Sequence, residues 1–134
     1  MPLSRSELIA LSETYFESCN RKDWQAVMDT FAPECVMWFP AATFEYRGKE
    51  ALGVHFEDFL NTFSTVNFHD YQHIIDPVTQ SVCTYFWVEL IQANGERAEM
   101  RNCNLFNLDD AGLFKEIIIY NSGALDAGFH AGSE

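Results

Sequence analysis

Three side chains of this sequence combine acid–base chemistry with strongly apolar neighbours. His55 stands in LGVHFEDFL and His73 in DYQHIID. A histidine with an ordinary pKa near about 6.5 can give or take a proton at neutral pH. Glu89 follows TYFWV, where loss of water would raise the pKa of its carboxyl and make it a usable base or acid. Proton transfer on an apolar substrate is therefore the first chemistry to consider.

A phenol and an amide could hold the negative charge that such a reaction develops. Tyr15 lies in ETYFES, and Asn104 lies in RNCNLF two residues after Asn102. Hydroxyl and amide N–H groups aimed at a carbonyl oxygen stabilise the enolate that forms when a neighbouring carbon loses its proton. Each group also has a plain structural explanation, because Tyr15 can pack with its hydroxyl bonded to another tyrosine and the two amides can bond each other.

Metal and cofactor motifs do not emerge from the sequence. His69 and His73 alternate with their neighbours along one predicted strand, so both should point to the same face, but they have no third ligand at a recognised spacing. The four cysteines show no CxxC spacing and are expected to be reduced and mostly buried. We therefore expect no metal and no cofactor.

The charge balance restricts the possible partners. Twenty acidic residues against eight Lys and Arg give a net charge of −12 over 134 residues, which repels nucleic acid and anionic membrane surfaces. No apolar run reaches the length of a membrane span, and MPLSRSELIA lacks the apolar segment of a signal peptide. We expect a cytoplasmic protein that binds neither nucleic acid nor membrane.

Helical periodicity dominates the first half of the chain. Helices are predicted from about residue 5 to 19, from 24 to 31 and from about 48 to 63, with a strand over 35–39. Trp24 should face inward from the second helix, and His55 and Phe59 should share one face of the third. Ser4 and Glu7 form a capping-box pattern before the first helix, and Asp23 is the expected N-cap of the second. Pro33 should end that second helix, because the residue before a proline avoids helical geometry.

Strand patterns fill the second half. Strands are predicted over 66–75, 81–91, 96–108 and 113–120. Helices followed by antiparallel strands are typical of an α+β domain with the helices on one sheet face. Both faces of the long strands carry apolar side chains, so a second subunit should cover the face that the helices leave open.

The dipeptide Asn94-Gly95 is the strongest hairpin signal and, as a two-residue turn, would set the register of the long strands. Such a turn places six residues on one sheet face: Tyr85, Trp87, Glu89, Met100, Asn102 and Asn104. A carboxylate and two amides among aromatic side chains suit a cavity for a polar ligand, because buried polar groups need partners. In the open alternative the amides bond each other and Glu89 reaches solvent or an arginine.

Three segments resemble the ketosteroid-isomerase-like, or SnoaL-like, branch of the nuclear transport factor 2 superfamily. They are YFESCNRKDWQAVMDTFAPECVMWFP, RGKEALGVHF and NCNLFNLDDAGLFKEIIIYNSG. The resemblance implies a cone-shaped α+β fold in which a curved sheet wraps a long helix around an apolar pocket, and homodimers through the open sheet face. We expect one such domain over residues 1–123 and a loose Gly- and Ala-rich tail over 124–134.

The functional residues of the family are only partly present. The resemblance places Tyr15 and Asn104 where the steroid isomerases keep their two oxyanion donors. Phe39 occupies the position of their catalytic Asp, which excludes steroid isomerisation with that base. His69 or His73 matches the dehydratase histidine, but the carboxylate that should pair with it at the end of the first helix is missing. The acidic residues of the epoxide hydrolases and polyketide cyclases are also missing.

The sequence thus predicts cofactor-independent acid–base catalysis of isomerase, cyclase or dehydratase type. The substrate would be an apolar carbonyl compound such as a polyketide or terpenoid. The candidate catalytic residues are Tyr15, Asn104, His55, Glu89 and His73, and the candidate pocket residues are Trp38, Phe39, Phe59, Tyr85, Trp87, Met100 and Asn102. Two alternatives stay open: a non-catalytic small-molecule-binding module, and a structural dimer whose pocket is filled by its own side chains.

Overall fold

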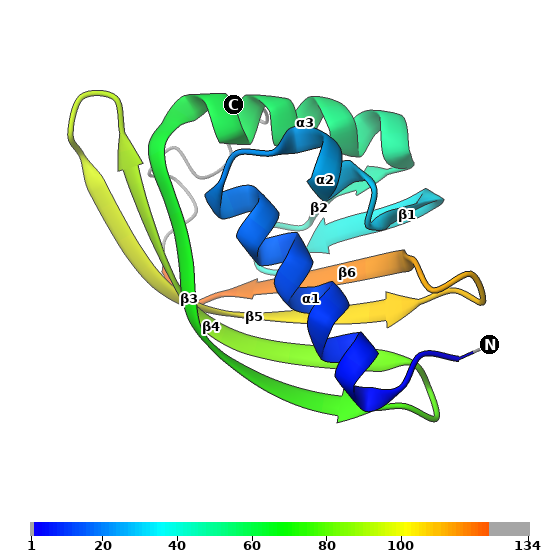
Figure 1. The fold of residues 1–134 in the computed structure, drawn as a ribbon. Helices are drawn as coiled ribbons and strands as arrows, with labels where there is room; N and C mark the ends of the chain where they lie inside the picture. Colours follow the sequence, from blue (N-terminus) through cyan, green and yellow to red (C-terminus); the bar gives the residue numbers. More distant parts are fainter. Residues whose placement is uncertain (1, 124–134) are drawn as a thin grey trace.

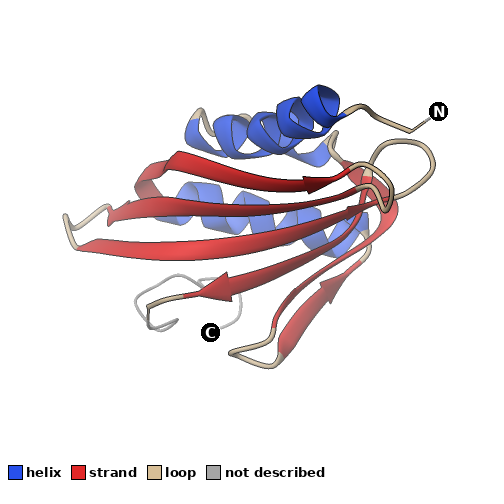
Figure 2. Cartoon of the chain, turned by 90° about the horizontal axis from the view of Figure 1, so that it is seen from below, coloured by secondary structure: helices blue, strands red, loops and turns tan. Residues whose placement is uncertain are grey.

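The computed structural model describes residues 2–123, in which the helices lie on one face of a six-stranded sheet (Figure 1, Figure 2). The helices are α1 (Arg5–Asn20), α2 (Trp24–Met28) and α3 (Lys49–Thr62). The strands are β1 (Phe31–Phe39), β2 (Phe44–Arg47), β3 (Phe63–Asp76), β4 (Ser81–Gln92), β5 (Arg97–Leu108) and β6 (Phe114–Asn121). Their order in the sheet is β2-β1-β6-β5-β4-β3, and only the β1–β6 pair is parallel among these strands. The predicted α+β class is confirmed.

Helix α1 is fixed at its start by the predicted capping box. The Ser4 hydroxyl accepts a hydrogen bond from the Glu7 amide at 3.2 Å, and the Glu7 carboxylate accepts one from the Ser4 amide at 2.8 Å. Phe16 is fully buried beneath the helix and packs on Phe86, with ring centres 4.6 Å apart. We call the face of the sheet that α1 and α3 cover its inner face. Aromatic packing between Phe16 and Phe86 holds α1 on this face.

Polar contacts tie the last turns of α1 to β3. The Asn20 side chain donates to the Phe68 carbonyl at 2.9 Å and accepts from the Phe68 amide at 2.7 Å. One turn earlier, Glu17 accepts a hydrogen bond from the Tyr71 hydroxyl. These contacts fix the position of α1 along β3.

The second helix differs from the prediction. It ends at Met28, and Phe31 is the first, fully buried residue of β1. Pro33 lies inside β1 where the register with β6 is interrupted, so its missing N–H breaks no regular ladder. Trp24, predicted to face inward, is 39% exposed and donates its indole N–H to the Gly53 carbonyl at 3.0 Å.

The hairpin between β4 and β5 has three loop residues rather than the predicted two. Ile91 pairs with Arg97, and the Gln92 amide donates to the Glu96 carbonyl at 2.8 Å. Gly95 takes a φ of +91° to close this loop. The extra residue shifts the register by one, so the prediction that six residues share a face is wrong.

The corrected register divides the six residues between the two faces. Met100, Asn102 and Asn104 point to the inner face with Thr84, Phe86 and Val88. Tyr85, Trp87 and Glu89 point to the opposite, outer face, where Trp87 pairs with Arg101. Any role of these last three residues in an inner cavity is thereby excluded.

A bulge in β3 separates the two strand histidines. Asp70 has a φ of +58°, and the register with β4 shifts between His69 and Gln72. His69 therefore pairs with Trp87 on the outer face, whereas His73 pairs with Thr84 on the inner face. The expectation that both histidines point the same way is wrong. The predicted loose tail, residues 124–134, lies outside the described residues.

Replacing Gly95 tests the loop geometry. Nothing lies within 4 Å of a Cβ added there, so Gly95→Ala carries only the backbone cost of positive φ, about 1 kcal/mol. Urea unfolding should show that loss, and Gly95→Asn should lose less, because asparagine tolerates this conformation better. An alanine variant as stable as the parent would contradict the three-residue loop.

Candidate functional site

A cavity lies between α1, α3 and the inner face of the sheet. Six residues that the sequence predicted for the site line it: Tyr15, Phe39, His55, Phe59, Asn102 and Asn104. Reasoning from sequence missed five others: Met37, Phe56, Phe68, Phe86 and Ile119. The sequence shows which strand residues share a face and which helix residues share a side. It does not show which of the two sheet faces points to the helices, because that depends on the strand register described above.

The cavity is narrow as it stands. The space inside it that water molecules could occupy is about 30 Å³. All the empty space between its walls, including the part open to solvent, is about 380 Å³. Space of about 30 Å³ holds one or two water molecules, whereas a drug-sized ligand occupies about 300 Å³ or more. The aromatic walls must therefore move before a ligand of that size can bind.

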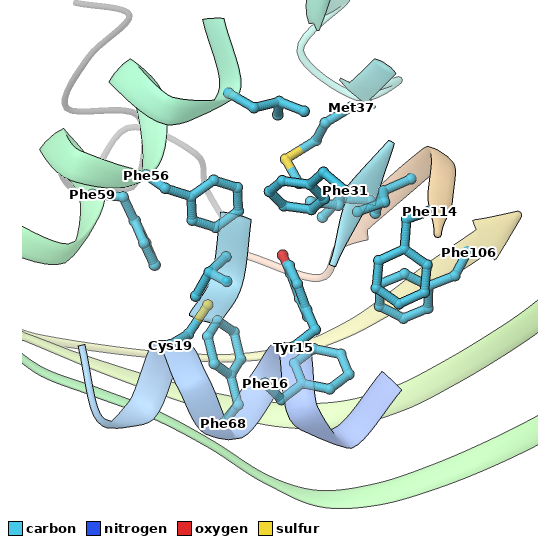
Figure 3. Packing of buried hydrophobic residues seen from close by; sticks show 14 of the residues in the cluster. Tyr15, Phe16, Cys19, Phe31, Met37, Phe56, Phe59, Phe68, Phe106 and Phe114 are labelled. Carbon is cyan, nitrogen blue, oxygen red and sulfur yellow. The ribbon is translucent and has the colours of Figure 1, made fainter. Parts of the chain in front are cut away.

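Tyr15 brings a phenol into this apolar space. Its side chain is 3% exposed, and five rings surround it with centres 5.0 to 6.1 Å away: Phe16, Phe31, Phe56, Phe106 and Phe114. Figure 3 shows the hydroxyl pointing away from Phe16, toward the space between Phe31 and Phe56. Burial raises the pKa of Tyr15 well above its ordinary value of 10.0, so the hydroxyl stays protonated and can donate a hydrogen bond.

Asn104 and Asn102 place amides on the same wall. Asn104 is 2% exposed, and its Oδ1 has no hydrogen-bond partner within the described residues. Asn102 Oδ1 accepts a long hydrogen bond of 3.4 Å from the Ser122 amide. A buried amide atom without a hydrogen-bond partner costs about 1–3 kcal/mol of stability. A polar ligand that bonded to Asn104 Oδ1 would remove that cost.

Asn121, which the sequence prediction did not include, places a third amide on the inner face, next to the lining residue Asn102 but not itself among the lining residues. It lies directly opposite Asn102, and both polar atoms of its side chain are buried without a partner in residues 2–123. The signal was present in β6, because Ile117, Ile119 and Asn121 alternate onto the inner face.

His55 is the acid–base side chain that lines the cavity from α3. It is 6% exposed and stacks on Tyr46, with ring centres 4.3 Å apart and planes at 28°. Phe39 meets it edge-on at 6.2 Å, in the position where the steroid isomerases carry their base. The predicted helical face that carries His55 and Phe59 is confirmed.

Four predicted site residues lie on the outer face of the sheet instead. The Arg101 guanidinium lies 4.1 Å from the Trp87 ring centre and donates to the Tyr85 hydroxyl at 3.3 Å. Glu89 forms an ion pair with Arg97, as in the alternative interpretation of its role. Trp38 borders a surface hollow, because strand alternation turns Met37 and Phe39 inward. Met100 is buried on the inner face but is not among the cavity-lining residues.

His73 belongs to a hydrogen-bond chain away from the cavity lining. Its Nε2 lies 2.8 Å from a Glu13 carboxylate oxygen, and its Nδ1 lies 2.9 Å from the Thr84 hydroxyl. A carboxylate only accepts hydrogen bonds, so Nε2 carries a proton, and Nδ1 of a neutral ring then accepts a hydrogen bond from the Thr84 hydroxyl. This chain clamps α1 to β3 and β4, and the placement does not bring His73 to the cavity.

Comparison with solved structures shows the same fold in several proteins. A protein of unknown function with a cystatin-like fold from Methylobium petroleophilum PM1 superposes with a TM-score of 0.78 at 23% identity, covering 96% of this chain and 84% of the other. A proposed polyketide cyclase from Xanthomonas campestris pv. campestris gives 0.77 at 18% identity, covering 97% and 98%. A proposed isomerase from Bacillus subtilis gives 0.80 at 13% identity, covering 96% and 95%. Identities this low establish the fold alone.

Sequence comparison gives a narrower result. The family described as the SnoaL-like domain matches residues 12–117. No curated protein matches this chain. Within residues 2–123, no cluster of three His, Cys, Asp or Glu side chains could hold a metal ion, and no helix has the length and apolar character needed to cross a membrane.

Phe39→Asp tests how tightly the cavity wall is packed. Phe39 is 1% exposed and stacks on Phe44, with ring centres 5.0 Å apart. We expect an aspartate there to cost about 3–5 kcal/mol in urea unfolding at neutral pH, because it removes a packed ring and buries a carboxyl. Phe39→Leu is the control and should lose less. Stability close to the parent would show instead that this position opens to water.

Proposed function

We propose, from the premise that this chain belongs to the SnoaL-like domain family, that it binds an apolar carbonyl compound in its cavity and catalyses proton transfer on it. The fold is shared with a proposed polyketide cyclase and a proposed isomerase, both names that imply small organic substrates. Isomerisation, cyclisation and dehydration all begin with loss of a proton beside a carbonyl or with its polarisation. The cavity residues supply the groups for that common step.

The observation that carries this proposal is the pairing of Tyr15 and Asn104 on one apolar cavity. A neutral phenol and an amide come from α1 and β5, and both side chains are almost fully buried. Hydrogen-bond donors in a water-poor site stabilise a developing oxyanion far more than they would in water. A substrate carbonyl within about 3 Å of both donors would be polarised toward its enolate.

His55 is proposed to move the proton. It approaches the cavity from α3, across from the sheet that carries Asn104. An imidazole within reach of the carbon beside the carbonyl can take its proton and return it to another atom. Phe39 contributes apolar surface instead of a carboxylate, so this chemistry depends on a single acid–base group in the described lining.

A binding module without catalysis is the second candidate. It is favoured by Phe39, which stands at the position that the resemblance assigns to the base of the steroid isomerases. The small free volume of the cavity favours instead the structural alternative, in which side chains fill the pocket. Both candidates require the same ligand contacts, and they differ only in whether His55 exchanges a proton with the bound molecule.

Tyr15→Phe tests the ligand contact. The probe is para-nitrophenol, bound as its phenolate, whose oxygen resembles an enolate oxygen. Loss of one charge-assisted hydrogen bond should weaken binding by about 1–3 kcal/mol, roughly 5-fold to 150-fold, in calorimetric titration. Tyr120→Phe is the matched control, because Tyr120 is 50% exposed on the outer face, and its affinity should equal that of the parent.

Proton exchange separates catalysis from binding. In heavy water the protein should speed deuterium incorporation into the methyl group of acetophenone, and His55→Gln should abolish that acceleration. Phenolate binding that is unchanged in Tyr15→Phe would remove the oxyanion site. If the parent protein binds the phenolate but does not speed deuterium exchange into acetophenone, the non-catalytic binding module is the better description of its function.

The outer face of the sheet supports a proposed homodimer. Partly exposed aromatic side chains gather there: Trp38, Tyr85, Trp87 and Tyr120. Burying these side chains against a second copy would remove apolar surface from water and stabilise both.

Sedimentation tests this dimer. At micromolar concentration the mass should be about 31 kDa, twice the chain mass of 15.4 kDa. Tyr120→Glu should shift the mass toward that of a single chain, because it would bury a charge in the interface. Val78→Glu, at a turn residue that is 91% exposed, should leave the mass unchanged. A parent protein that sediments as a monomer would contradict the dimer.

A further inference from the structure

The inner-face amides outnumber what a carbonyl oxygen can use. Tyr15 and Asn104 suffice to donate to one oxyanion. Asn121 lies two residues beyond Ile119, which lines the cavity, and directly opposite Asn102, which also lines it. Both polar atoms of Asn121 are buried without a hydrogen bond inside the described chain, so Asn121 needs a partner that residues 2–123 do not provide.

The unused atoms include acceptors as well as a donor. Asn104 Oδ1 and Asn121 Oδ1 can only accept hydrogen bonds, and each is buried and unpaired within residues 2–123. A ligand that offers nothing but a carbonyl would leave both oxygens without a donor. A ligand that also carries a hydroxyl or enol O–H would satisfy one of them while its carbonyl faces Tyr15.

The charge of the lining indicates a neutral ligand. The described lining residues include no carboxylate, ammonium or guanidinium group. Apart from the one oxyanion that Tyr15 and Asn104 can stabilise, an ionised group on the ligand would lose its hydration without gaining a charged partner, whereas a hydroxyl needs only the amide oxygens.

We infer that the ligand of this cavity is a neutral hydroxy-carbonyl compound or its enol, and that Asn121 together with Asn104 selects its hydroxyl group. This inference rests on the proposed function, because it assumes that the carbonyl binds at Tyr15. It adds a specificity site on β5 and β6, beside the oxyanion donors. The alternative is that a water molecule, rather than a ligand, bonds to these amides, since the free space is large enough for one.

Four probes on one benzene ring separate the two groups. Ethylbenzene has neither group, para-ethylphenol has the hydroxyl, acetophenone has the carbonyl, and hydroxyacetophenone, as its meta and para isomers, has both. Affinities for the full chain are measured by ligand-observed NMR titration at neutral pH. We expect the hydroxyl to raise affinity about fivefold or more in each comparison, which is one neutral hydrogen bond to a desolvated acceptor.

Asn121→Leu should remove that hydroxyl gain and leave ethylbenzene binding unchanged or stronger, because leucine keeps the size of the side chain without its polar atoms. Asn94→Ala, at the exposed β4–β5 turn, is the control and should keep the full hydroxyl gain. Tyr15→Phe should lose the carbonyl gain but keep the hydroxyl gain. Failure of Tyr15→Phe alone would thus count against the oxyanion site and not against Asn121.

Melting temperature gives a second test that does not depend on ligand. Removing two unpaired buried polar atoms should make Asn121→Leu melt at a higher temperature than the parent. A lower melting temperature, or failure to fold, would show that the amide already has a structural partner and would overturn the inference. Equal affinities for ethylbenzene and para-ethylphenol in the parent protein would show that the amides hold only water, which also overturns it.

Discussion

The packing of α1 against the inner face of the sheet is the contact on which the rest of the structure depends. Phe16 fills the space beneath the helix, while Asn20 bonds to the backbone of β3 and Glu13 to His73. These contacts fix both the height of α1 above the sheet and its position along β3. Tyr15 is carried to the cavity by that placement, and its hydroxyl has no freedom to turn toward water. His73, which the resemblance offered as a match to the dehydratase histidine, bonds to Glu13 of α1 in this structure.

Much of the fold was readable from local patterns. The capping box at Ser4 and Glu7 and the helical spacing of His55 and Phe59 predicted two helices correctly, because these signals act within a few residues. The face of each strand residue was less predictable. It depends on loop length and on bulges, and one extra residue beside Gly95 moved Tyr85, Trp87 and Glu89 to the outer face.

The bulge at Asp70 gave no signal in the sequence, because an aspartate at positive φ looks like any other strand residue in a pattern of alternation. Asn121 was overlooked for a different reason. An amide at the end of a strand is commonly solvated, and only the opposing position of Asn102 shows that its polar atoms are buried. The described cavity lining therefore offers hydrogen-bonding groups and no carboxylate, because Glu89, which the predicted register placed there, lies on the outer face.

The parallel pairing of β1 with β6 has a mechanical consequence. That ladder is short and interrupted after Phe31, whereas the antiparallel ladders of β3, β4 and β5 run nearly the full length of their strands. Helix α3 packs on β1 and β2 near one edge of the sheet (Figure 1) and continues directly into β3, the strand at the other edge. The two edges of the sheet are therefore joined through α3. A force that parted the short β1–β6 ladder would also have to part α3 from β1 and β2, so the helix reinforces the sheet where its hydrogen bonding is weakest.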